Sequence, residues 1–180
     1  FSTVERRFKG LGILLQGLGR EHIDFLELGS HELFLPEDDE LYEKCMDQLS
    51  YLNQHLSPIT GFTNTYLPVR DIEKFGFNKV QKAIKTQGEG QINTGKMMRN
   101  LLHYAHKLEV QVLNGVEVFQ LDQEDERVSI DSNIGRIQAS KCVIATNGFS
   151  KRFLPEIDVQ PTRAQVLITN PINGLKMSGI

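Results

Sequence analysis

A change of hydrophobic period near residue 109 constrains this chain more than any other feature. Residues 89–108 have the pattern of a glycine-containing turn followed by an amphipathic helix, which Asn93 or Thr94 can cap. Beyond residue 109 the period becomes two, which predicts strands over 110–113, 116–121, 127–130 and 136–138. The helix and the alternating hairpins together predict a mixed α/β fold that contains an antiparallel meander.

The segment after these hairpins has a different pattern, because residues 142–145 are apolar on both faces. Such a segment is typical of a buried strand in a parallel sheet. A strand that stops at small residues places backbone amides at the carboxyl edge of the sheet, where open α/β sheets bind cofactors. On composition alone, a cofactor-binding edge and a plain strand-to-turn exit are equally supported. The small residues at this exit are Ala145, Thr146, Asn147 and Gly148.

The first half of the chain predicts two amphipathic helices. Apolar residues recur at helical spacing over residues 4–18, and Gly19 follows at the position of a cap. Pro36 and the acidic residues after it predict the start of a second helix, because negative charge suits a helix N-terminus. Pro58 is expected to stop that helix. Its apolar stripe consists of Leu41, Cys45, Leu49, Leu52 and Leu56.

Short extended segments are expected around these helices. Residues 27–35 and 83–86 both have extended patterns, and the second is followed by a glycine-rich turn. Residues 57–80 give no clear periodicity. Pro68 nevertheless argues against a central strand in that stretch, because proline cannot donate a ladder hydrogen bond.

Composition excludes several classes of function. The 180 residues are 39% hydrophobic and 24% charged, as in an ordinary globular protein. A net charge of -3, with scattered lysines and arginines, gives no basic patch for nucleic acid. No apolar run approaches the roughly 18 residues that a membrane helix needs. Cys45 and Cys142 are too few for a disulfide framework, and we expect two buried thiols in a cytoplasmic protein.

Residues Gly90–Lys96 match the phosphate-binding pattern GxxxxGK, and a predicted helix follows them. The match stops there, because Met97 stands where a Ser or Thr hydroxyl would hold magnesium. A turn and a helix cap explain the pattern better, although a nucleotide-binding protein remains an alternative. His103 and His106 lie three residues apart, but no third ligand is apparent, so no metal site is predicted.

The glycine fingerprint GxGxxG of dinucleotide-binding folds is absent. Three GxG pairs occur, but Leu15, His22 and Asn93 stand where the third glycine belongs. Without that glycine the backbone cannot approach a pyrophosphate closely, so the chain carries no pyrophosphate site of its own. Because the chain also begins with Phe1, we expect an internal piece of a longer protein.

Four segments, in order and spacing, resemble the D-amino acid oxidase superfamily of FAD-dependent oxidoreductases. The similarity is clearest over residues 88–170 and looser over 1–87. Within the superfamily, the chain is most similar to glycine oxidase, sarcosine oxidase and D-amino acid dehydrogenase-like proteins. The four segments are Gly90-Gln91-Ile92-Asn93-Thr94, Asn114-Gly115-Val116-Glu117-Val118, Lys141-Cys142-Val143-Ile144-Ala145-Thr146-Asn147-Gly148-Phe149 and Pro161-Thr162-Arg163-Ala164-Gln165-Val166-Leu167.

The resemblance implies roles for particular residues. Val116 or Val118 would touch the adenine of FAD through its backbone. The small-residue exit formed by Ala145, Thr146, Asn147 and Gly148 would pack near the linking chain of the flavin. Arg163 lies in a segment that would lead back toward the flavin, where it binds a substrate carboxylate or forms an ion pair instead.

The resemblance also implies the reaction. A full-length parent would oxidise a small amine or amino acid by hydride transfer to the flavin of FAD, and water would hydrolyse the resulting imine. Residues 1–88 would be mostly substrate domain, 89–155 FAD domain, and 156–180 the return to the substrate domain. No catalytic residue is identifiable, and the oligomeric state is not indicated. We expect this chain alone to be inactive. A P-loop-like nucleotide-binding protein and a non-catalytic interaction module on a flavoprotein-like scaffold remain alternatives.

Overall fold

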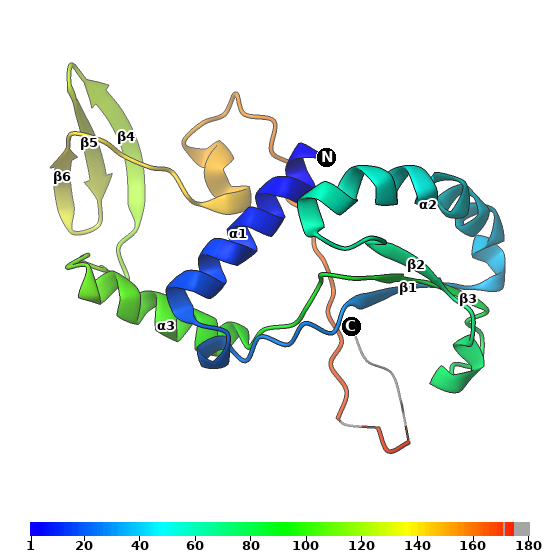
Figure 1. Ribbon diagram of the computed structural model, residues 1–180. Helices are drawn as coiled ribbons and strands as arrows, with labels where there is room; N and C mark the ends of the chain where they lie inside the picture. The colour runs from blue at the N-terminus through cyan, green and yellow to red at the C-terminus, as the bar shows by residue number, and fades with distance from the viewer. Residues whose placement is uncertain (171, 175–180) are drawn as a thin grey trace. The chain divides into compact units, whose positions relative to one another are not determined.

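The computed structural model describes residues 1–170 and 172–174, which form two compact units. The first unit consists of residues 1–110 together with 172–174, and the second of residues 111–170. Figure 1 traces the chain through both units, with α1 (Ser2–Leu18) at its start. The mixed α/β class predicted from the sequence is confirmed, and both sheets are antiparallel.

Helices of the first unit pack around an apolar core formed by Leu18, Ile23 and Phe25. α1 ends at Gly19, as predicted, and contributes Leu18 to this core. α3 (Thr94–Lys107) packs against the same core through apolar residues that include Met97 and Leu101. Its N-cap is Asn93, whose side chain accepts a hydrogen bond from the Lys96 amide.

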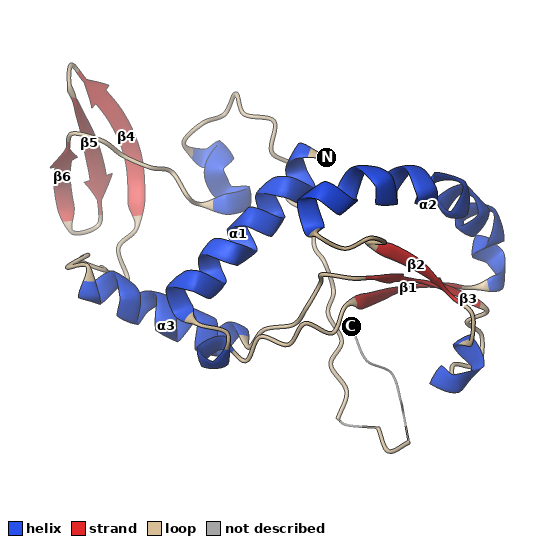
Figure 2. Ribbon diagram, viewed as in Figure 1, coloured by secondary structure: helices blue, strands red, loops and turns tan. Residues whose placement is uncertain are grey.

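The first unit also contains a three-stranded sheet in the order β1-β3-β2. Its strands are β1 (Ser30–Phe34), β2 (Tyr66–Val69) and the central β3 (Lys82–Thr86). α2 (Asp39–Thr60) lies along the sheet (Figure 2). A second apolar cluster, in which Ile72 and Phe75 pack with Ala83 of β3, includes residues of the short helix η3 (Ile72–Phe75).

The edge strand β2 is tied to α2 by one buried side chain. Asn53 of α2 is 6% exposed, and its Nδ2 donates to the carbonyl of Tyr66 at 2.9 Å. Its Oδ1 accepts from the Tyr66 amide at 2.8 Å. Pro68 lies two residues further along β2, at the edge rather than the centre of the sheet, as predicted. The other side of β2 pairs with β3. Directly beside these strands, the Gln87 amide donates to the Thr65 carbonyl.

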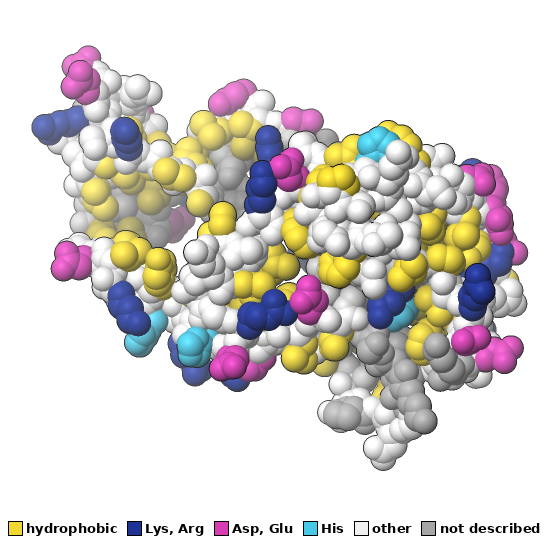
Figure 3. Space-filling view, in the orientation of Figure 1, with side chains coloured by type: hydrophobic (Ala, Val, Ile, Leu, Met, Phe, Trp, Pro, Cys, Tyr) yellow, Lys and Arg dark blue, Asp and Glu magenta, His cyan; other side chains and the backbone are white. Residues whose placement is uncertain are grey.

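The second unit contains the predicted antiparallel meander. Its strands β4 (Val118–Glu124), β5 (Arg127–Ser132) and β6 (Gly135–Ala139) pair in chain order. The register places Ile130 between Leu121 and Ile137, so apolar side chains share one face. Figure 3 shows hydrophobic side chains on the visible surface of this meander.

Two predicted strands are absent from the structure. Residues 110–113 and 142–145 have irregular backbone, and Val143 is 86% exposed. Any strand requires a neighbouring strand to pair with its backbone groups, and no described strand pairs with either segment. The prediction of two buried thiols was wrong, because Cys142 is exposed in this segment and Cys45 is only half-buried.

The end of α2 also differs from the prediction. The helix continues past Pro58 to Thr60 and is closed by Gly61, whose amide donates to the Ser57 carbonyl. Because Pro58 lies in the last turn, only a short stretch of helix follows it, and the glycine cap provides the stop. None of the described helices is long and apolar enough to cross a membrane.

Candidate functional site

The backbone around Val116, a predicted cofactor contact, is held in place by Asn133. Asn133 Oδ1 accepts from the Glu117 amide, and Asn133 Nδ2 donates to the Gly115 carbonyl, both at 3.0 Å. The Asn133 amide donates to the Glu117 carbonyl at 3.0 Å. Within the described part of the chain, the peptide N–H of Val116 donates no hydrogen bond and its C=O accepts none. A fixed backbone with a free donor and acceptor suits recognition of a planar ring with its own donors and acceptors. Val118 begins β4 two residues later.

The small-residue exit forms a tight turn. Thr146 precedes the short helix η4 (Asn147–Arg152), and the Phe149 amide donates to the Thr146 carbonyl at 3.0 Å. Asn147 has a φ of 51°, a left-handed conformation that asparagine tolerates better than most residues. Ala145, Thr146 and Asn147 are all exposed. The turn is therefore specified by local hydrogen bonds rather than by burial.

Two contacts join this exit to other parts of the second unit. A Cβ placed on Gly148 would lie 2.7 Å from the Cβ of Pro161, so only glycine allows this approach. The guanidinium of Arg152 lies 3.3 Å from the Glu117 carboxylate. The structure therefore brings the exit close to the segment containing Val116. Arg163, two residues beyond Pro161, is exposed.

In the loop that matches a phosphate-binding pattern, two backbone amides already donate hydrogen bonds to other parts of the protein. The amide of Gln91 donates to Leu26 O at 3.0 Å, and the amide of Asn93 donates to Ile23 O at 2.8 Å. The ammonium of Lys96 lies 2.7 Å from the carboxylate of Asp24. A phosphate-binding loop requires free amides and an available lysine. The geometry therefore argues against the P-loop alternative.

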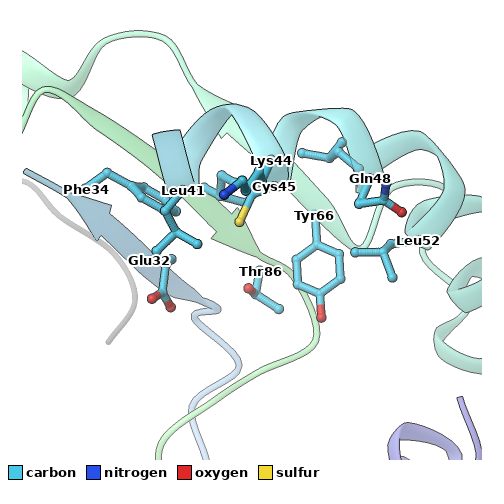
Figure 4. Close-up of a pocket in the computed structure, with 11 residues that line it drawn as sticks. Glu32, Phe34, Leu41, Lys44, Cys45, Gln48, Leu52, Tyr66 and Thr86 are labelled. Carbon is cyan, nitrogen blue, oxygen red and sulfur yellow. The ribbon is translucent and has the colours of Figure 1, made fainter. Parts of the chain in front are cut away.

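The first unit contains a largely apolar cavity of about 490 Å³ between α2 and the sheet. Figure 4 shows Cys45 of α2 at its edge, with Phe34 and Tyr66 contributed by the sheet. Four members of the predicted apolar stripe of α2 line this cavity rather than a close-packed core, and only Leu56 is fully buried. The ring of Tyr66 forms part of the wall, and its hydroxyl points away from α2 (Figure 4).

Potential metal ligands do not gather in the described structure. Among residues 1–170 and 172–174, no three His, Cys, Asp or Glu side chains could hold a metal ion together. His103 and His106 are both exposed on α3.

The helices, the meander and the turn at Gly148 occur in a fold shared with FAD-dependent oxidoreductases. The chain belongs to the protein family described as FAD dependent oxidoreductase (DAO), which it matches over residues 7–179. The resemblance found in the sequence is thereby confirmed, and FAD is the cofactor of this family.

Solved structures share the fold at low sequence identity. Glycine oxidase from Bacillus cereus ATCC 14579 is 19% identical with a TM-score of 0.62, and the match covers 84% of this chain and 41% of that one. NikD, an amino acid oxidase essential for nikkomycin biosynthesis, is 16% identical with a TM-score of 0.59, covering 83% of this chain and 38% of that one. The chain therefore spans about two fifths of these structures.

A curated relative matches over a shorter stretch. An uncharacterized CzcO-like oxidoreductase from Geobacillus kaustophilus (strain HTA426) is 33% identical over 73 residues. That stretch is 41% of this chain and 21% of the relative.

Sequence reasoning missed the residues that hold the predicted site together. Asn133 is not among the predicted site residues, and the approach of Gly148 to Pro161 has no signal in either local pattern. The one available clue to the role of Asn133 was its position in the turn after β5, because an asparagine side chain in a turn often hydrogen-bonds to nearby backbone.

Proposed function

We propose that this chain is part of a longer protein that oxidises a small amine or amino acid with FAD. The match to the FAD-dependent family over residues 7–179 carries the proposal. Two of the solved structures with the same fold are named as a glycine oxidase and an amino acid oxidase, which supports the substrate class. FAD, when bound, supplies the redox chemistry by accepting a hydride from the carbon that bears nitrogen.

The second unit would hold one end of the cofactor. The free peptide groups of Val116, kept in position by Asn133, fit the edge of an adenine ring, and Val118 extends the same backbone. Ala145, Thr146, Asn147 and Gly148 would lie near the linking chain of the flavin. Arg163 would bind a substrate carboxylate, because a guanidinium matches a carboxylate in geometry and charge. No side chain is assigned to catalysis.

The proposal extends to domain roles. Residues 1–88 would belong mostly to the substrate domain, 89–155 to the FAD domain, and 156–180 to the return segment. The 180-residue chain alone would not turn over substrate, because it lacks the three-glycine fingerprint that holds a pyrophosphate. A cytoplasmic location is part of the same proposal and rests on the two free cysteines, which suit a reducing compartment.

An absorbance spectrum of the purified full-length protein, beside one of the 180-residue chain, tests this proposal. We expect flavin bands in the full-length protein and none in the chain alone. Turnover is then measured on a panel of amines and amino acids. Bound flavin without turnover of any of them would contradict the substrate class, and absence of flavin would favour the interaction-module alternative.

The role of the Val116 backbone has its own test. Asn133→Ala removes both side-chain hydrogen bonds that fix Gly115 and Glu117. We expect the affinity for FAD to fall by about tenfold, which corresponds to roughly 1.4 kcal/mol. Asn114→Ala is the matched control, because that exposed side chain makes no described hydrogen bond. Equal FAD affinity in the two variants, measured by flavin fluorescence, would refute this role for Asn133.

A further inference from the structure

Three asparagines in this chain are followed directly by glycine, at positions 114, 147 and 173. Such a pair can undergo spontaneous deamidation, because glycine carries no Cβ that would hinder attack by its own backbone nitrogen. The surroundings of the first two pairs, Asn114-Gly115 and Asn147-Gly148, are described on both sides, and both pairs belong to the second unit. The two pairs differ in how firmly the structure holds them.

The chemistry of deamidation sets structural requirements. The backbone nitrogen of the glycine attacks Cγ of the asparagine side chain, so an N–Cγ bond forms and the Cγ–Nδ2 bond breaks. The amide nitrogen leaves as ammonia, taking the proton of the glycine N–H. Water then opens the cyclic imide at either carbonyl carbon and gives aspartate or the β-linked isoaspartate, with no change of oxidation state. The reaction therefore needs an unengaged glycine N–H, a free asparagine side chain and room for the ring.

Asn114-Gly115 meets each of these requirements. Both residues are exposed, and their backbone belongs to no helix or strand. Within the described part of the chain, neither the Asn114 side chain nor the Gly115 N–H makes a hydrogen bond. Apart from chain neighbours, no heavy atom lies within 4 Å of the place that a Cβ on Gly115 would take. The surroundings thus leave room for the ring to close.

Asn147-Gly148 is held more firmly. The Asn147 carbonyl accepts a hydrogen bond from the Ser150 hydroxyl at 2.8 Å, within the short helix η4. The turn is also closed by the Phe149 amide, which donates to the Thr146 carbonyl at 3.0 Å. Ring closure rotates the peptide that joins Asn147 to Gly148, and that peptide carries the bonded carbonyl. Deamidation at Asn147 therefore requires that this turn open first.

The residues after Gly115 give deamidation of Asn114 a structural consequence. Asn133 holds the segment through the Gly115 carbonyl and the Glu117 amide, both at 3.0 Å. An isoaspartate at position 114 lengthens the main chain by one carbon immediately before these contacts. Because hydrogen bonds weaken steeply as their distance and angle change, the longer chain disturbs both of them. The new carboxylate also places a negative charge close in sequence to Glu117.

We propose that Asn114-Gly115 is a site of spontaneous deamidation, at which the ageing protein acquires an isoaspartate that releases the Val116 segment from Asn133. The fresh protein holds this segment in place, and the converted protein does not. Because Val116 would contact the adenine of FAD, the converted protein binds FAD more weakly, and this last effect rests on the function proposed above. The modification and the release of the segment require no flavin.

Incubation of the full-length protein in neutral buffer, followed by peptide mapping with mass spectrometry, tests the proposal. Fragmentation that distinguishes aspartate from isoaspartate identifies the product, and digestion at mildly acidic pH stops the reaction during analysis. We expect Asn114 to convert at least about tenfold faster than Asn147, because conversion at Asn147 first breaks the hydrogen bonds of its turn. Equal rates at the two positions, faster conversion of Asn147, or no isoaspartate at position 114 would overturn the proposal.

Hydrogen exchange of the Glu117 amide reports whether Asn133 still holds the segment. We expect exchange to become about fivefold faster or more in molecules that carry the isoaspartate, through loss of this hydrogen bond. Asn114→Gln is the matched variant, because it keeps an amide but would have to close a larger ring, and its exchange should not change during incubation. Asn114→Asp adds the charge without the extra carbon and should exchange as the fresh protein does. Unchanged exchange in converted wild-type molecules would contradict the release of the segment.

Failure of this proposal is distinguishable from failure of the proposed oxidase function. Selective conversion of Asn114 and faster exchange at Glu117, in a protein without a flavin spectrum, would leave the modification site standing and remove the oxidase. A flavin spectrum and turnover without selective conversion of Asn114 would do the reverse. Where both hold, the affinity for FAD should fall as the isoaspartate fraction rises, and a constant affinity would overturn the link between them.

Discussion

Replacing Asn53 by alanine should destabilise the first unit more than any exposed substitution in α2. Asn53 is buried, and its amide makes two hydrogen bonds with the backbone of Tyr66, at 2.8 and 2.9 Å. Each such bond contributes about 1 kcal/mol, and leaving buried peptide groups unpaired adds to the loss. Alanine offsets roughly 0.5 kcal/mol of this through its higher helix propensity.

The net loss for Asn53→Ala is therefore about 2–3 kcal/mol. For a chain of this size that corresponds to a fall in Tm of very roughly 4–12 °C. Far-UV circular dichroism during urea and heat denaturation provides the assay, because the chain has no tryptophan to report by fluorescence. Gln54→Ala is the matched control, since its neighbouring side chain is exposed.

A loss below about 1 kcal/mol for Asn53→Ala would refute the reasoning. It would mean that water satisfies the Tyr66 peptide groups once the amide is removed. Asn53→Asp provides a further check, because the carboxylate keeps an acceptor for the Tyr66 amide but loses the donor to its carbonyl. We expect it to be at least as destabilising as alanine, owing to the buried charge.

Three further predictions concern other contacts in the two units. Gly148→Ala would place a Cβ 2.7 Å from Pro161 and should cost about 1–3 kcal/mol in the second unit, whereas Gly10→Ala, which meets open space, should not destabilise; urea denaturation compares them. Tyr66 should ionise above the ordinary value of 10.0 in a spectrophotometric titration, and Glu89→Gln should bring its pKa down. Since the folded pKa is raised, the stability linked to the neutral hydroxyl is complete below pH 10 and is lost as the pH rises through the folded pKa. Lys96→Ala should change stability by no more than about 1 kcal/mol, because its pair with Asp24 is exposed, and ATP binding that Lys96→Ala abolishes would revive the P-loop alternative.

Local patterns were enough to predict the elements that are stabilised by local contacts. The cap at Asn93, the glycine after α1 and the hairpin turns of the meander depend on neighbouring residues, so the sequence predicts them and the structure confirms them. The segments 110–113 and 142–145 have strand-like composition, but a strand also requires a partner for its backbone groups. Composition cannot report whether that partner is present.

In the candidate sites, too, features set by neighbouring residues were predicted and contacts between distant residues were not. The exit at Ala145–Gly148 was identified from its own residues, whereas the approach of Pro161 and the clamp by Asn133 are contacts between distant positions. Such pairs become visible only when the fold brings them together.

The attachment of Asn53 to β2 makes the first sheet extendable in one direction only. The outward-facing amide and carbonyl of Tyr66 are occupied by the Asn53 side chain, and Pro68, two residues on and facing the same way, has no N–H to offer. An approaching strand therefore finds no regular ladder along β2, whereas β1 has no described strand on its outer side. Any strand that joins this sheet, from the same protein or from another molecule, must add next to β1.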